Sequence, residues 1–313
     1  MRVELTTAVF DADEHVEDVL TLLKRFAAGR HRWVVEPTQV KAVESFLDRH
    51  YPTLAASYKD LARQSARQRA YSTPGAPAPL RVSADDFADY MADLERPAVV
   101  MVENDASDGG FIKAIACVFK DGVIVTAIEN EWLVIDHGGG TADLFRRASD
   151  KHSRFRRVSR VAVVLDSDRR LPGDPPDKHA DIERLRADGI KVHVLRLREI
   201  ENYIPDKVLR ELPRQVKPLP KVAALGRLTK EQRGHYDMKS GFKNGVVPPE
   251  QRPLYDGVPQ DVINDLADGF GRKVIETFLE HAAELTEEDF RTDVGPDVPE
   301  ELRAMLEMLR EIV

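Results

Sequence analysis

Carboxylates follow the apolar runs in the middle of the chain, at the point where each run ends. Glu103 comes directly after the run 99–102, and Asp166 and Asp168 follow the run 161–165. In a parallel sheet the carboxyl ends of the strands lie along one edge, where α/β proteins bind their ligands. We therefore expect these three side chains to converge. Clustered carboxylates tolerate their mutual repulsion when a hard divalent cation lies among them, and oxygen ligands favour Mg²⁺ or Mn²⁺ over zinc.

The spacing of Asp166 and Asp168 supports a shared cation. Alternate residues leaving a strand point the same way, so both carboxylates can reach one ion. Taken alone, an Asp-x-Asp after an apolar strand is a weak signal. Together with Glu103 and the Gly-rich turn at 138–140 it predicts a metal site at the sheet edge.

The elements that must position these residues alternate along the chain. The apolar runs 98–102, 132–135, 161–165 and 192–195 are typical of strands buried on both faces. Helical patterns occupy 110–119, 141–152 and 177–188 between them, and 122–129 fits either a helix or a strand. This alternation predicts an α/β fold with a central, mainly parallel sheet flanked by helices and joined by right-handed crossovers.

The flanking sequence has a different texture. Apolar residues recur at helical spacing before and after the central part, and the Pro-rich stretch 72–79 reads as a loop. We expect three regions: a helical N-terminal region (1–95), an α/β domain (96–205) and a helical C-terminal region (206–313).

Composition limits the classes of protein. The 313 residues are 42% hydrophobic and 32% charged with a net charge of −8. Such a chain can bury a sizeable core and is not a general polyanion binder, although a local basic patch is compatible with it. The single cysteine, Cys117, excludes an intrachain disulfide framework. Because no uncharged apolar run approaches the roughly 18–20 residues of a membrane span, and no signal-peptide pattern opens the chain, we expect a cytoplasmic protein without membrane contact.

The motifs resemble a known family. The segments 102–105 (VEND), 137–140 (HGGG), 165–168 (LDSD) and 198–203 (REIENY) are similar to the Toprim (topoisomerase–primase) domains of OLD-type (overcoming lysogenization defect) nucleases and related phage-defence proteins. The resemblance covers about 97–205. Asn104 stands where many Toprim domains have Gly, and Ser107 stands where OLD-type members often have a second acid. No Walker A loop G-x-x-x-x-G-K-[ST] occurs, so an ATPase partner would be a separate chain.

The resemblance implies metal-dependent phosphodiester hydrolysis of nucleic acid, with DNA favoured over RNA. Asp166 and Asp168 would hold one cation, Mg²⁺ or Mn²⁺. Glu103, with Asp108 or Glu201, would hold a second or handle the proton. Lys239 is the candidate for neutralising charge on the phosphate, against the alternative of an ordinary surface lysine.

Basic residues surround the third apolar run. Arg154, Arg156 and Arg157 precede it and Arg169 follows it. Phosphate contacts from these arginines would fix nucleic acid beside the metals and make binding salt-dependent. The alternative is a solvated helix and loop.

Other interpretations stay open. Glu199 fits an ion pair at a solvated helix start, and Tyr203 fits a packing role better than a nucleophile. A metal-dependent sugar transferase also places Asp-x-Asp after an apolar strand, but gives Glu103 no clear duty. A non-catalytic Toprim-like module that binds nucleic acid or a partner is the main alternative to a nuclease. The sequence leaves the oligomeric state open.

Overall fold

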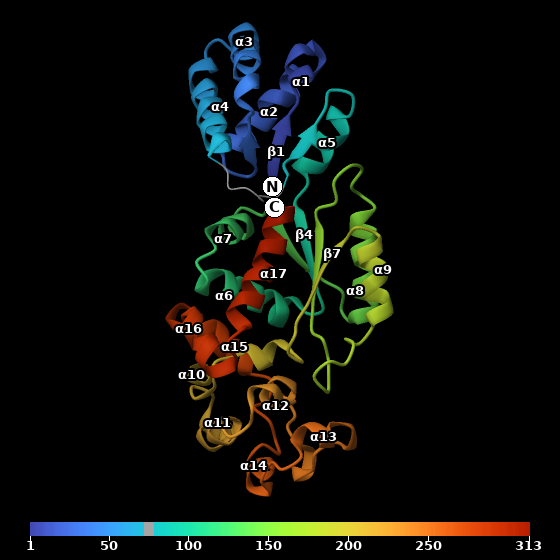
Figure 1. The fold of residues 1–313 in the computed structure, drawn as a ribbon, viewed down its shortest axis with the longest axis vertical. Helices are drawn as coiled ribbons and strands as arrows, with labels where there is room; N and C mark the ends of the chain where they lie inside the picture. The colour runs from blue at the N-terminus through green and yellow to red at the C-terminus, as the bar shows by residue number, and fades with distance from the viewer. Residues whose placement is uncertain (72–77) are drawn as a thin grey trace.

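The central part of the molecule is a four-stranded sheet with helices on both faces (Figure 1). The computed structural model describes residues 1–71 and 78–313, so most of the loop predicted at 72–79 lies outside the described residues. The strands β4 (Ala98–Val102), β5 (Leu133–His137), β6 (Val161–Leu165) and β7 (Lys191–Val194) are all parallel, in the order β5-β4-β6-β7. The predicted α/β class and parallel central sheet are confirmed.

Alternation along the inner strands divides the core into two layers. Ala98, Val100 and Val102 of β4 face one apolar cluster, while Val99 and Met101 face another. Helices α6 (Gly110–Val118), α7 (Gly122–Glu129) and α17 (Val298–Ile312) contribute to the first cluster. Helices α8 (Thr141–His152) and α9 (His179–Ala187) contribute to the second. Burial on both faces explains why the strands read as continuous apolar runs.

The N-terminal region contains the predicted helices and also a sheet that was not predicted. Strands β1 (Arg2–Leu5), β2 (Arg32–Val34) and β3 (Leu80–Val82) are parallel, in the order β2-β1-β3. Charged residues interrupt all three short strands, so none forms a continuous apolar run. The helices are α1 (Thr7–Asp11), α2 (Val16–Ala27), α3 (Val40–His50), α4 (Ala55–Ala70) and α5 (Phe87–Glu95).

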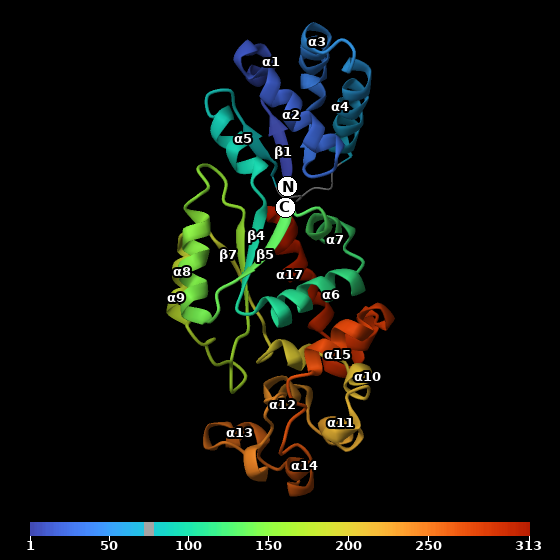
Figure 2. The same cartoon turned by 180° about the vertical axis from the view of Figure 1, so that it is seen from behind.

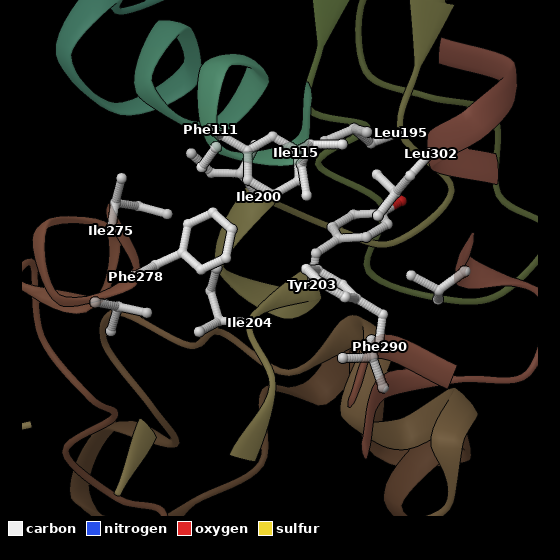
Figure 3. Packing of buried hydrophobic residues seen from close by; sticks show 14 of the residues in the cluster. Phe111, Ile115, Leu195, Ile200, Tyr203, Ile204, Ile275, Phe278, Phe290 and Leu302 are labelled. Atoms are coloured by element: carbon white, nitrogen blue, oxygen red, sulfur yellow. The ribbon is translucent and has the colours of Figure 1, made fainter. Parts of the chain in front are cut away.

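The C-terminal region shares the core of the central sheet. Phe111 of α6 packs on Tyr203 and Phe278, with ring centroids 5.9 and 5.8 Å apart, and Leu302 of α17 joins the same cluster (Figure 3). Its helices are α10 (Asp206–Leu209), α11 (Pro218–Leu225), α12 (Lys230–His235), α13 (Arg252–Tyr255), α14 (Gln260–Asp265), α15 (Val274–His281) and α16 (Glu287–Asp289), before α17.

The N-terminal region and helices α10 to α14 lie at opposite ends of the central sheet, whereas α17 runs alongside the sheet toward the N-terminal region (Figures 1 and 2). The N-terminal region adjoins the amino ends of the strands. There Asp93 of α5, fully buried, accepts the backbone N–H groups of Arg156, Arg157 and Val158 at 2.7–3.0 Å. Helices α10 to α14 lie beyond the carboxyl ends (Figure 2). Among the described residues no helix is long and apolar enough to span a membrane.

Candidate active site

The ends of β4 and β6 bring two of the predicted carboxylates together. The strands are direct neighbours, with Met101 paired to Val163, so Glu103 and Asp166 leave the sheet side by side. Glu103 Oε1 accepts a hydrogen bond from Thr141 Oγ1 at 3.3 Å. Asp166 Oδ1 accepts the backbone N–H of Ile200 at 2.9 Å. These bonds orient each carboxyl at the carboxyl edge of the sheet.

Their electrostatics show a crowded acidic cluster. Burial raises the pKa of Asp166 well above its ordinary value, and the charges of Asp108 and Glu201 raise it further. Burial likewise raises the pKa of Glu103, the hydrogen bond from Thr141 opposes this, and Asp108 and Asp168 add to it. The charges of the other predicted acids therefore reach Glu103 or Asp166. We call Glu103, Asp108, Asp166, Asp168 and Glu201 the acidic cluster.

The predicted strand alternation, which would point the side chains of Asp166 and Asp168 the same way, does not hold. The strand ends at Leu165, and Asp168 has a left-handed backbone with φ of 51°, so alternation does not extend to it. Its side chain is more exposed than that of Asp166. Its backbone N–H donates to the carbonyl of Arg198 at 3.0 Å, which fastens the loop after β6 to the loop after β7.

Asp108 is held by the turn that follows β4. Its Oδ2 accepts the backbone N–H of Asn104 at 2.9 Å, and its Oδ1 accepts Ser107 Oγ at 2.7 Å. Asn104, which departs from the Toprim pattern, caps the same turn by accepting the N–H of Ala106 at 2.9 Å. Asp108 therefore reaches the cluster from a fixed turn, although it is one position later than the family's second acid.

Lys239 is anchored in the site by two carboxylates. Its Nζ lies 3.1 Å from Glu199 Oε2 and 3.0 Å from Glu201 Oε1. Glu199 is 7% exposed and Glu201 2% exposed. The expected ion pair of Glu199 with an arginine is present, to Arg198 at 3.4 Å, but the expected solvated setting is wrong. The second oxygen of Glu201, Oε2, is buried and has no hydrogen-bond partner among the described residues. Because Arg198 Nε and Lys239 Nζ both lie beside Glu199, the unpartnered oxygen in this group is Oε2 of Glu201.

A close backbone approach fixes the segment that carries Lys239. The N–H of Gly271 donates to the carbonyl of Lys239 at 3.1 Å, and that of Phe270 donates to Met238 at 2.7 Å. A Cβ at Gly241, where φ is +72°, would lie 2.3 Å from the backbone nitrogen of Gly269. Only glycine allows this contact, which holds Lys239 against the sheet edge.

The donor set fits a hard divalent cation in kind. It consists of carboxylate oxygens, one of them buried and unpartnered, in a region where neighbouring acids raise the pKa of Glu103 and Asp166. The side chains are not arranged as a ready cage: no three His, Cys, Asp or Glu residues within the described ranges form a group that would hold an ion.

The basic run before β6 lies at the wrong end of the sheet. Arg154, Arg156 and Arg157 precede this parallel strand, so they lie at its amino end, opposite Asp166. Arg156 Nη1 pairs with Asp89 at 2.6 Å and Arg157 Nη2 with Asp86 at 2.5 Å. Their predicted role in positioning nucleic acid beside the cluster is therefore wrong. Arg169, in the loop after β6, lies at the correct edge.

The Gly-rich turn after β5 is structural. Gly139 and Gly140 have positive φ, and a Cβ at Gly138 would lie 2.5 Å from the backbone of Leu144. Asp136 pairs with Arg147 and Lys151 of α8, which withdraws it from the cluster. Tyr203 is also structural, as expected: it is fully buried, and its hydroxyl donates to Glu301 at 2.8 Å.

Fold and site together define a parallel α/β protein with an acidic cluster and a paired lysine at the carboxyl edge of its sheet. No protein-family model, curated protein or solved structure matches the chain.

Proposed function

We propose that the protein is a Mg²⁺- or Mn²⁺-dependent nuclease of Toprim type, acting on DNA in preference to RNA. The observation that carries this proposal is the acidic cluster around Asp166 with the unpartnered Oε2 of Glu201, because buried carboxylate oxygens without a partner favour a bound cation. The Toprim resemblance supplies the substrate class. In the same proposal the protein is cytoplasmic and works with a separate ATPase subunit in phage defence.

In this proposal the residues of the site have three roles: binding the cation, transferring a proton and balancing charge on the phosphate. Asp166 and Asp168, with Glu103 and Asp108, would hold the cation, which when bound supplies Lewis-acid activation of water and charge neutralisation at the phosphate. Glu103 is suited to carry a proton, since burial raises its pKa and, within the described part of the chain, Thr141 is the one hydrogen-bond donor to its carboxylate, at 3.3 Å. Lys239, positioned by Glu199 and Glu201, would balance the charge that develops on the phosphoryl oxygens.

Cleavage of plasmid DNA, single-stranded DNA and RNA with Mg²⁺ or Mn²⁺ tests the proposal, with and without candidate ATPase partners. Glu103→Gln keeps the size and the acceptor for Thr141 but removes the proton-accepting carboxylate. It should lose at least about 100-fold in rate while still binding substrate. Asp143→Asn on α8, outside the cluster, is the matched control. Equal cleavage by Glu103→Gln and wild type would refute the mechanism.

A non-catalytic module is the second candidate. It is favoured by the absence of a ready metal cage among the described residues and by the pairing of Lys239 with two carboxylates. Nucleic-acid binding without cleavage of any of the three substrates, in either metal, would decide for this function.

A further inference from the structure

Two clefts at the carboxyl edge of the sheet meet at Arg170 and Arg198. The first has a volume of about 490 Å³ and is lined by Asp168, Arg169, Arg170 and Arg198, together with Asp174 and Asp177. The second, of about 350 Å³, shares Arg170 and Arg198 with the first and extends to Lys243. We call this pair of hollows the arginine cleft.

The acids along the cleft already have partners. Asp174 Oδ2 accepts the backbone N–H of Leu171 at 3.2 Å, and Asp177 pairs with Lys178 at 3.3 Å. In the second hollow, Asp237 Oδ1 accepts the N–H of Ser240 at 2.7 Å, and Glu250 pairs with Arg170. Among the described residues, these contacts leave Asp168, on the side of the acidic cluster, as the cleft acid whose side chain forms no hydrogen bond or ion pair.

The arginines, by contrast, carry donors that lack acceptors. The Nε atoms of Arg169 and Arg198 are buried and have no hydrogen-bond partner among the described residues. The Nε of Arg198 lies 3.4 Å from Glu199 Oε1 without forming a hydrogen bond, and its Nη2 reaches Asp237 at 3.2 Å. Buried charged donors without acceptors are costly, so a ligand that supplies oxygen atoms would stabilise both arginines.

Arg198 is also the best-fixed cation of the cleft. Its backbone N–H donates to the carbonyl of Gly234 at 2.9 Å, and its carbonyl accepts the N–H of Asp168 at 3.0 Å. Its side chain is 18% exposed, which leaves part of the guanidinium open to the cleft. A planar guanidinium held from both sides matches the paired oxygens of a phosphate group.

We propose that the arginine cleft binds a phosphodiester group of the substrate next to the acidic cluster, with Arg198 as the main contact and Arg169 and Arg170 beside it. The inference rests on the proposed function for its substrate class, nucleic acid. It assigns to the carboxyl edge the phosphate contacts that the arginines before β6 cannot make. The cleft and the cluster then form two halves of one site, one anion-binding and one cation-binding.

Binding of a fluorescently labelled single-stranded DNA oligonucleotide in EDTA, across a series of KCl concentrations, tests this without requiring cleavage. Arg198→Met should weaken binding by about tenfold or more and reduce the salt slope by about one phosphate contact. If Arg198→Met does not fold, Arg170→Met replaces it, because the side chain of Arg170 pairs with the exposed Glu250; it should show a smaller loss in the same direction. Arg146→Met on α8 is the matched control and should bind like wild type.

The outcomes separate this inference from the proposed function. Wild-type affinity and salt slope in both Arg198→Met and Arg170→Met would overturn the arginine cleft, even if the protein cleaves DNA. Loss of binding in these variants supports the cleft, even if wild type cleaves nothing with either metal. A rise in melting temperature with inorganic phosphate that Arg198→Met abolishes, without oligonucleotide binding, would overturn nucleic acid as the ligand.

Discussion

The Nζ of Lys239 lies 3.0 Å from Oε1 of Glu201, a carboxylate that is almost completely buried. Burial of Lys239 opposes its charge, but Glu201 and Glu199 outweigh this and raise the pKa of the lysine. Because Lys239 belongs to the C-terminal region and Glu201 follows β7, this contact joins the sheet to the helical region beyond its carboxyl edge. Its energetic importance can be measured directly.

Lys239→Met should destabilise the protein at pH 7, since it removes the cation beside buried Glu201 and leaves buried Glu199 with Arg198 alone. Removing one partner of a buried ion pair lowers the free energy of unfolding by about 3–5 kcal/mol. Because Lys239 is partly exposed, we expect a loss at the low end, about 3 kcal/mol. Burial raises the pKa of Glu199. Protonation of Glu199 should therefore reduce the loss of stability in Lys239→Met as the pH falls toward 4. Urea denaturation at pH 7 and pH 5 measures this, with Lys113→Met on α6 as control. Equal stability of Lys239→Met and wild type at pH 7 would contradict it.

Asp166→Asn should raise the melting temperature in EDTA at pH 7. A carboxyl whose pKa is higher in the folded than in the unfolded protein destabilises the fold once the pH exceeds the unfolded value, so the cost is present at pH 7 and is lost on acidification toward about pH 4. Burial raises the pKa of Asp166 in this way, and asparagine keeps the acceptor for Ile200. Calorimetry between pH 7 and pH 5 should show the two melting temperatures approaching each other. A variant that melts below wild type at pH 7 would show that the charge is not a liability.

Mg²⁺ or Mn²⁺ should raise the melting temperature of wild type. A ligand that binds only the folded state stabilises it by about 2.7 kcal/mol at a hundredfold excess over Kd. The double variant Asp166→Ala/Asp168→Ala should lose this response, whereas Asp143→Ala/Asp150→Ala on α8 should keep it. If the first pair responds to metal as wild type does, these aspartates are not the ligands.

Gly241→Ala should be more harmful than Gly257→Ala. Both glycines have positive φ, so both substitutions incur the left-handed cost of about 1–2 kcal/mol. Only the Cβ at position 241 meets the backbone of Gly269, since that at 257 has no atom within 4 Å. The additional loss, roughly 1–3 kcal/mol for overpacking, should appear in urea denaturation together with reduced cleavage, because the clash displaces Lys239. Equal losses in the two variants would argue against a tight contact.

Arg156→Ala/Arg157→Ala should bind nucleic acid like wild type, because both side chains pair with α5 at the amino edge of the sheet. Exposed pairs contribute only about 0–1 kcal/mol each. Asp93→Ala should be more damaging, since the partly buried backbone N–H groups of three residues lose their acceptor. Limited proteolysis of the 153–160 loop should be faster in Asp93→Ala than in the double arginine variant. The reverse order would contradict the role of Asp93.

The sequence predicted the bounds of β4 and β6 because every residue in these strands is apolar and buried. It did not predict β1 to β3, because these strands are short and each contains a charged residue: Arg2 and Glu4, Arg32, and Arg81, respectively. Propensity and periodicity detect a strand by its burial pattern, and strands of three or four residues carry too little of it.

The candidate site was predictable where strand topology alone decides it. Glu103 and Asp166 follow neighbouring parallel strands, so their convergence follows from the fold. The arginines before β6 were misjudged because nearness in sequence to Asp166 was taken for nearness in space, although a whole strand separates the two ends. The burial of Glu199 and the position of Arg198 depend on packing of the C-terminal region, which no local pattern encodes.

The backbone bonds from Asp168 to Arg198 and from Arg198 to Gly234 connect the loop after β6, the loop after β7 and α12 in one series. The three segments are far apart in the chain, so this series can form only once the C-terminal helices have docked on the sheet. The amide protons of Asp168 and Arg198 should therefore exchange with solvent at similar rates, governed by one opening event. Hydrogen exchange at these two amides would report how often the assembled edge comes apart in the native protein.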